Sequence, residues 1–301
     1  MRVTQSMLAS NSLKNISKSY ERMGNYQDQL STGKKINRPS DDPVVAIKGM
    51  FYRTNLTEVE QYKRNLSEAY TWMENSEAGI EHATQIVQRM RELVVQGQNG
   101  TNSSNDLNSM GVEIGQLKED LVNVANTQVA GRYIFNGEKT QTAPIPEGSL
   151  TMVDDKGIYS FEQNTSAFNV EVSKGVNLKV NINSQNVFGQ DFLNLVQQIE
   201  EGLTNGTETF ENGDQLLEQL DGHIDKMISE RAELGARYNR LELIDSRLAD
   251  QEVIANRILS DNEDADLERV ITDLTIQESI HRASLSVGSR IIQPTLIDFL
   301  R

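Results

Sequence analysis

Proline is missing from long stretches of this chain, and that absence constrains the fold more than any other feature. The 301 residues contain five prolines, at positions 39, 43, 144, 146 and 294. Residues 44–143 and 147–293 therefore hold none. Because proline breaks or kinks a helix interior, these two tracts are free to form long helices.

Apolar residues recur in these tracts at steps of three and four, which places them along one side of a helix. The clearest series is Val59, Tyr62, Leu66, Ala69, Met73, Ser76, Ile80, Ala83, Val87, Met90 and Val94. Shorter series occupy 9–30, 107–128, 214–259 and 276–291. A single helix over 44–97 would be roughly 80 Å long at 1.5 Å per residue. The sequence predicts a mainly α, elongated rod.

The middle of the chain has a different pattern. Residues 149–184 alternate with a period of two, most clearly in FNVEV (168–172) and VNLKVNI (176–182), which predicts strands. Asn136-Gly137 stands between two short strand-like runs, and this dipeptide favours a two-residue hairpin turn. We expect a small β domain with a core of its own, inserted between two helical halves.

The composition excludes several classes of protein. The chain is 37% hydrophobic and 6% aromatic, with a net charge of −15 and a pI near 4.7, which argues against nucleic-acid binding. It has no cysteine. No apolar run has the length of a signal peptide or a transmembrane helix. We therefore expect no nucleic-acid or membrane partner, and a secretion route other than the general one if the protein leaves the cell.

Catalytic patterns are weak. Ser31-Thr32-Gly33-Lys34 fits the Ser-x-x-Lys pattern, but no companion motif follows. The acidic run from Asp261 lacks the glycine of a calcium loop, and we expect it to begin a helix. The three histidines are far apart in the sequence. We expect no enzyme activity, no metal and no cofactor.

The two ends carry opposite charge. Residues 1–40 hold seven bases and two acids, a net of +5, and residues 260–301 hold eight acids and four bases, a net of −4. Two amphipathic helices of opposite charge can pair, although two unrelated solvated faces would look the same in the sequence. Between the first two helical series lies LSTGKKINRPSDDP (30–43), which could be a phosphate loop, a basic patch or a joint between helices.

Several stretches resemble the flagellin family. LSTGKKINRPSDDP (30–43) is similar to the segment that ends the first terminal helix of that family. MRELVVQGQNGTNSSNDLNSMGVEI (90–114) resembles its second and third rod helices, and SERAELGARYNRLE (229–242) its returning helix. The resemblance covers roughly residues 1–140 and 210–301. VAGRYIFNGEKT (129–140), the moderate length and the ending TLIDFLR are most similar to members at the junction between hook and filament, with filament-forming flagellin as the alternative.

The resemblance implies a division of the chain. Residues 1–42 and 261–301 would be terminal coiled-coil segments, 43–142 and 188–260 a helical rod with a short hairpin, and 143–187 the inserted β domain. The joint would consist of Gly33, Pro39 and Pro43, since Gly33 can end a helix and the prolines stop it from continuing. The predicted assembly interface, the apolar stripe expected to face the partner helix, is Leu13, Ile16, Tyr20, Met23, Leu30, Ile276, Ile280, Ala283, Val287 and Ile291.

The function implied is structural. The chain would be an exported adaptor at the hook–filament junction, outside the cell. Its partners would be hook-associated protein 1, flagellin, copies of itself in a ring or helical layer, and a cytosolic export chaperone before secretion. A different class, an acidic coiled-coil binding module with no role in the flagellum, stays open on the composition alone.

Overall fold

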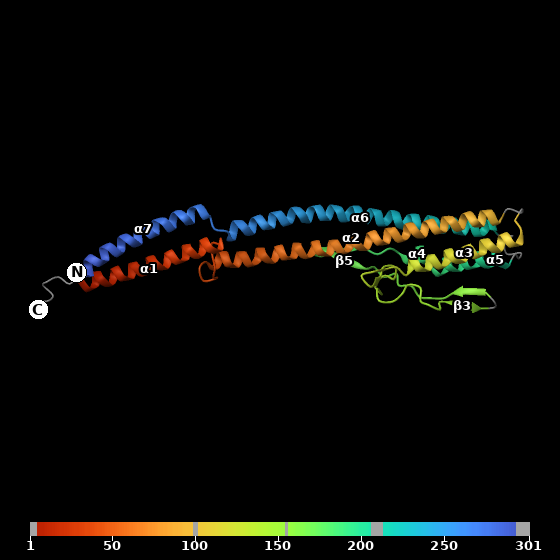
Figure 1. Ribbon diagram of the computed structural model, residues 1–301, viewed down its shortest axis with the longest axis horizontal. Helices are drawn as coiled ribbons and strands as arrows, with labels where there is room; N and C mark the ends of the chain where they lie inside the picture. Colours follow the sequence, from red (N-terminus) through yellow and green to blue (C-terminus); the bar gives the residue numbers. More distant parts are fainter. Residues whose placement is uncertain (1–4, 99–101, 154–155, 206–212, 293–301) are drawn as a thin grey trace, which may run out of the picture. The chain divides into compact units, whose positions relative to one another are not determined.

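The computed structural model describes residues 5–98, 102–153, 156–205 and 213–292, and they are mainly helical (Figure 1). The chain forms two compact units. The terminal unit consists of Met1–Glu58 and Asp250–Arg301, and the central unit of Val59–Ala249. Among the described residues, no helix is long and apolar enough to span a membrane.

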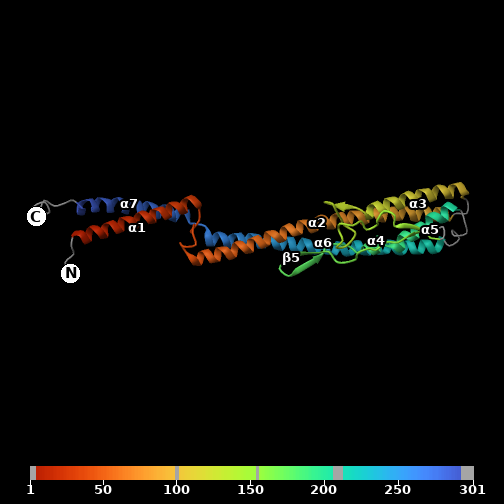
Figure 2. The same cartoon turned by 90° about the horizontal axis from the view of Figure 1, so that it is seen from below.

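Four helices contribute to the terminal unit: α1 (Gln5–Thr32), the start of α2 (Pro43–Gly97), the end of α6 (Gly213–Glu263) and α7 (Leu267–Ile292). α1 and α7 lie side by side in both views (Figures 1 and 2). They run antiparallel, because Gly33 is bonded to Ala265 while Ser19 is bonded to Gln277. The two ends of the sequence therefore pair with each other.

The central unit has a continuous apolar core formed mainly by α2, α3 (Ser104–Ala125), α5 (Gln190–Asn205) and α6. Every residue of the predicted series from Val59 to Val94 is buried except the half-buried Tyr62. α3 begins with a capping box, in which the Ser103 hydroxyl accepts from the amide of Asp106 and the Asp106 carboxylate accepts from the amide of Ser103. The prediction of a mainly helical chain is confirmed.

No periodic apolar series marks α4 (Ser184–Phe188) or α5, although α5 falls within the predicted helical rod of 188–260. α5 lies against α3 and buries an apolar face, which consists of Phe192, Leu193, Leu195, Val196, Ile199 and Leu203. An ionic contact joins the same two helices, because the buried Lys118 ammonium of α3 contacts Glu200 and donates to Gln197 at 2.7 Å. α5 is therefore part of the core and not a connecting segment.

The strands form three separate antiparallel pairs and no common sheet. They are β1 (Gln128–Val129) with β2 (Arg132–Tyr133), β3 (Leu150–Val153) with β4 (Lys156–Tyr159), and β5 (Asn169–Ser173) with β6 (Val176–Lys179).

The hairpin turn predicted at Asn136-Gly137 is wrong. The first pair turns at Ala130 and Gly131, which both have a positive φ (50° and 76°). Asn136 is buried instead, and its side chain binds the carbonyl of Thr142 and the amide of Asn164. Asn136 thus stabilises a loop, because its side-chain amide forms hydrogen bonds with other segments. The residues that follow Gly137 do not form the predicted second strand.

The expectation of an independent β core is also wrong. Val172 and Val180 are fully buried and belong to the same apolar cluster as the helices. The rings of Phe168 and Trp72 lie 5.0 Å apart, and Arg237 of α6 donates to the carbonyl of Asn181 at 2.8 Å. The strand pairs are too small to bury both of their faces alone, so they pack on the helices. The division at 143 and 187 stays a prediction.

Candidate functional site at the joint between α1 and α2

The loop that follows α1 begins with a glycine in a left-handed conformation. Gly33 has φ +68°, and its amide donates to the carbonyl of Gln29 at 2.8 Å, which closes the last turn of the helix. A side chain would strain the backbone at this φ. The neighbouring backbone is paired with the other end of the chain: Ala265 donates to Gly33 at 2.8 Å and Lys35 donates to Glu263 at 2.7 Å.

The end of this loop starts the next helix. Pro43 is the first residue of α2, where its missing amide proton costs nothing. The Asp42 carboxylate accepts from the amides of Val44 and Val45 at 2.9 and 3.1 Å and so caps the helix. Pro39 lies in the turn before it. The structure thus places Gly33, Pro39 and Pro43 between two helices and leaves no continuous helix from α1 to α2.

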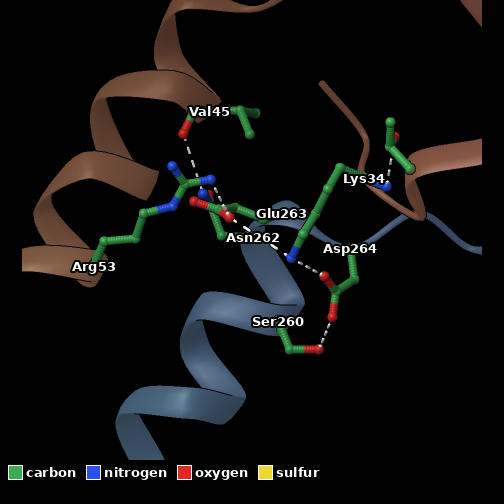
Figure 3. A network of polar contacts seen from close by, with 8 residues as sticks. Lys34, Val45, Arg53, Ser260, Asn262, Glu263 and Asp264 are labelled. Atoms are coloured by element: carbon green, nitrogen blue, oxygen red, sulfur yellow. Dashed lines mark hydrogen bonds and ion pairs between the residues drawn. The ribbon is translucent and has the colours of Figure 1, made fainter. Parts of the chain in front are cut away.

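Side chains hold this loop to the end of α6 (Figure 3). The Lys34 ammonium lies 2.6 Å from a carboxylate oxygen of Asp264 and 3.8 Å from Glu263. The Glu263 side chain is 6% exposed, and Arg53 of α2 binds it at 2.7 Å. Loop, α2 and α6 therefore meet around one buried carboxylate.

Two further contacts tighten this network. Asn262 donates to the carbonyl of Val45 at 3.1 Å, as drawn in Figure 3. A methyl group built on Gly49 would lie 2.5 Å from a Glu263 oxygen, so the absence of a side chain at 49 lets the carboxylate approach α2. The hydrogen bond from Lys34 is the main reason that the pKa of Asp264 lies below its ordinary value, and the hydrogen bond from Ser260 lowers it further. Asp264 is therefore ionised at neutral pH, as the pair with Lys34 requires.

A cavity of about 330 Å³ lies beside the loop and is lined mainly by polar residues, among them Asp28, Gln29, Lys35 and Asp41. Some of these groups already have partners, since Gln29 donates to the carbonyl of Lys35 and Asp41 accepts from the amide of Arg38. No group of three or more potential metal ligands occurs in the described part of the chain. The contacts that the structure shows here hold the loop to α6, and α6 to α2.

The predicted apolar stripe on α7 does not face α1. Ile276, Ile280, Ala283 and Val287 are exposed, and the residue after each of them is less exposed; three of these following residues contact α1. The four following residues are Gln277, His281, Ser284 and Gly288. The side chain of Ile291 lies outside the part of α7 that the structure describes. The side of α7 that contacts α1 is therefore displaced from the predicted apolar stripe by one residue, about 100° around the helix.

The corresponding stripe on α1 is only partly in the contact. Ile16 and Met23 are half-buried, whereas Leu13, Tyr20 and Leu30 are exposed. The centre of the contact is polar: the Gln277 amide donates to the buried Ser19 hydroxyl at 2.7 Å. Among the described residues of the terminal unit, Ala255 and Val270 are the buried apolar side chains. The periodicity of apolar residues could not reveal this contact between α1 and α7, because the residues at its centre are small or polar.

Exposed apolar side chains are concentrated in the terminal unit. Among the residues whose burial the structure describes, 24 large apolar side chains are exposed, and 18 of them lie in that unit and six in the central unit. Monomeric proteins rarely leave large apolar patches uncovered, and such patches mark surfaces for other molecules. The sequence analysis identified part of this surface but assigned it to the contact within the chain.

Known proteins share this organisation. Residues 3–140 match the family model of the bacterial flagellin N-terminal helical region, and residues 217–300 match that of the C-terminal helical region. Flagellar hook-associated protein 3 of Escherichia coli is 27% identical over 310 aligned residues, covering 94% of this chain and 95% of the relative. Flagellin of Bacillus subtilis is 25% identical over 288 residues, covering 94% of each chain.

Solved structures agree on the fold. A flagellar hook-associated protein of Vibrio parahaemolyticus superposes with a TM-score of 0.65 and 23% identity, over 74% of this chain and all of that one. Hook-associated protein 3 of Legionella pneumophila superposes with a TM-score of 0.61 and 16% identity, over 70% of this chain and 98% of that one. The chain therefore belongs to the flagellin family, a family of structural, non-enzymatic proteins of the bacterial flagellum.

Proposed function

We propose that this protein is an adaptor at the junction of hook and filament, outside the cell, linking hook-associated protein 1 to the flagellin filament. One observation carries the proposal: the similarity to relatives named hook-associated protein 3 runs along nearly the whole chain, in Salmonella typhimurium (26% identity, 94% of this chain) as in Escherichia coli. A flagellar junction protein of Legionella pneumophila has the same fold. The comparable similarity to Bacillus subtilis flagellin keeps filament subunit as the second candidate.

The contacts of this adaptor would be made largely by the terminal segments, 1–42 and 261–301. The proposed interface comprises Leu13, Ile16, Tyr20, Met23, Leu30, Ile276, Ile280, Ala283, Val287 and Ile291. The exposure of Leu13, Tyr20, Ile280 and Val287 supports it, since a single chain leaves them uncovered. The joint residues Gly33, Pro39 and Pro43 would set the angle between these segments and the helical rod of 43–142 and 188–260.

The partners in this proposal are hook-associated protein 1 on one side, flagellin on the other, and copies of the chain within a layer. A cytosolic export chaperone is the partner before secretion. An adaptor needs two different contact surfaces, one for the protein on the hook side and one for the protein on the filament side. Head-to-tail contacts of this kind join unlike surfaces and can continue from one subunit to the next.

Removal of the gene tests this function. We expect cells without the protein to build hooks that lack filaments and to release flagellin into the medium, because the filament has nothing to attach to. Expression of the intact chain should restore attached filaments. Normal filaments in its absence, seen by electron microscopy of negatively stained cells, would exclude the junction role.

A further inference from the structure

The first turns of α2 expose an apolar face. Val44, Ile47 and Phe51 follow one another at steps of three and four, and Met50 lies beside them. These four side chains, here called the α2 face, are between 59% and 68% exposed. So much exposure on four neighbouring large side chains is unusual for a surface that faces water in the working state.

The end of α6 exposes a second apolar face. Ile254 and Ile258 are separated by four residues, and Val253 lies beside them. These three side chains, here called the α6 face, are 48%, 38% and 69% exposed, respectively.

The contacts described between α2 and α6 leave both faces exposed. α2 meets α6 through Val45 and Gly49, which contact Asn262 and Glu263. Ile47 is two residues from both of them, about 200° around the helix. Ala255 is the buried residue on this part of α6. Both faces thus lie on helices whose positions the joint network already fixes.

The charges beside the two faces are complementary. Lys48 lies next to Ile47, and within the described residues it forms no ion pair. On α6, Asp250, Ile254, Ile258 and Asp261 follow one another at steps of four, four and three, so acids stand at both ends of the apolar stripe. Arg257 borders the same face and leaves it with a net charge of −1. Opposite charges beside apolar patches select a partner and its orientation.

We infer that the α2 face of one copy docks on the α6 face of the next copy. This inference rests on the proposed function, in which copies of the chain lie side by side in a layer. The two faces are different surfaces of the same chain, so the contact is heterologous and leaves one free face of each kind at its ends. Such a contact adds copies without needing a second kind of protein.

Single cysteines test the contact, because the natural chain has none. Cells would produce two variants together, Phe51→Cys and Ile254→Cys, and their isolated flagella would be treated with a short bismaleimide. Each chain then carries one thiol, so a product of twice the chain mass must join two copies. We expect this product from the mixture and not from either variant alone.

A matched control uses Asn256→Cys, which is exposed on α6 but lies about 200° from Ile254. Mixed with Phe51→Cys, it is expected to give no dimer. A dimer from Phe51→Cys alone in equal yield, or no dimer from the mixture, would overturn the inference. If the mixture gives no dimer but these variants still hold filaments on hooks, the proposed function stands although the contact does not. If the parent chain cannot restore filaments, the proposed function itself fails.

Charge reversal gives an independent measurement in the same system. Lys48→Glu is expected to lower the yield of cross-linked dimer about fivefold or more, because it places like charges together. Adding Asp250→Lys and Asp261→Lys to the α6 variant should restore the yield. An unchanged yield with Lys48→Glu would show that the two faces do not meet.

Discussion

Deletion of residues 146–184, with a short Gly-Ser linker in their place, is expected to abolish the native central unit. The sequence alone suggested the opposite, an inserted domain with a core of its own. Within the described part of the deleted segment, five buried apolar side chains belong to the shared core, and these are Tyr159, Val172, Leu178, Val180 and Ile182. Each contributes about 1.5–3 kcal/mol when buried, so the loss is on the order of 10 kcal/mol, comparable to the whole stability of a domain.

Circular dichroism and thermal unfolding of the purified chain would measure this effect. The deletion variant should lose helicity and its cooperative transition. A milder change, Val180→Ala, should cost about 1–3 kcal/mol because it opens a small cavity. Lys174→Ala in the turn between β5 and β6 serves as the control and should change little. Native helicity and an unchanged melting temperature in the deletion variant would show that the strands are not part of the core.

The double variant Ile280→Asp and Val287→Asp is expected to block incorporation into the flagellum while leaving the free chain folded. Both side chains are about half exposed, so charges there meet water in the monomer and cost little. In an assembled interface the same charges would be buried without partners, which is costly. A penalty of about 3 kcal/mol corresponds to a loss of roughly a hundredfold in incorporation.

The measurement is the amount of each variant in isolated flagella, together with the unfolding curve of the purified chain. Thr275→Asp is the control, since it adds one negative charge at an exposed position on a different side of α7. Leu13→Asp on α1 should behave like the double variant. Normal incorporation of both would remove the exposed stripe from the interface. A lowered unfolding temperature would mean that the stripe supports the chain itself.

The sequence predicted those parts of the fold in which apolar periodicity and burial coincide. The series from Val59 to Val94 is such a case, because one chain supplies both sides of that core. In the pair of α1 and α7, apolar and buried positions do not coincide. The predicted apolar stripe of α7 is exposed, and its buried side includes Gln277 and Gly288. A pattern of apolar residues shows that a face is covered in the working state, but not which molecule covers it.

Long-range polar contacts at the joint were only partly predictable. The opposite charges of the two ends indicated that they pair, and Lys34 does meet Asp264, 230 residues away. The role of Glu263 could not be read from its neighbours in the sequence, because its burial depends on Gly49 and on Arg53 of another helix. Likewise, the alternation predicted strands but gave no sign that the β5–β6 region packs against α2 and α6 and that β4 packs against α5.

The position of the protein along the flagellum tests the central proposal most directly. Antibody against the chain, coupled to gold and applied to isolated flagella, should label one narrow band between hook and filament in electron micrographs. An adaptor occupies that place and no other. Gold distributed along the whole filament would contradict the junction role and would identify the chain as a filament subunit.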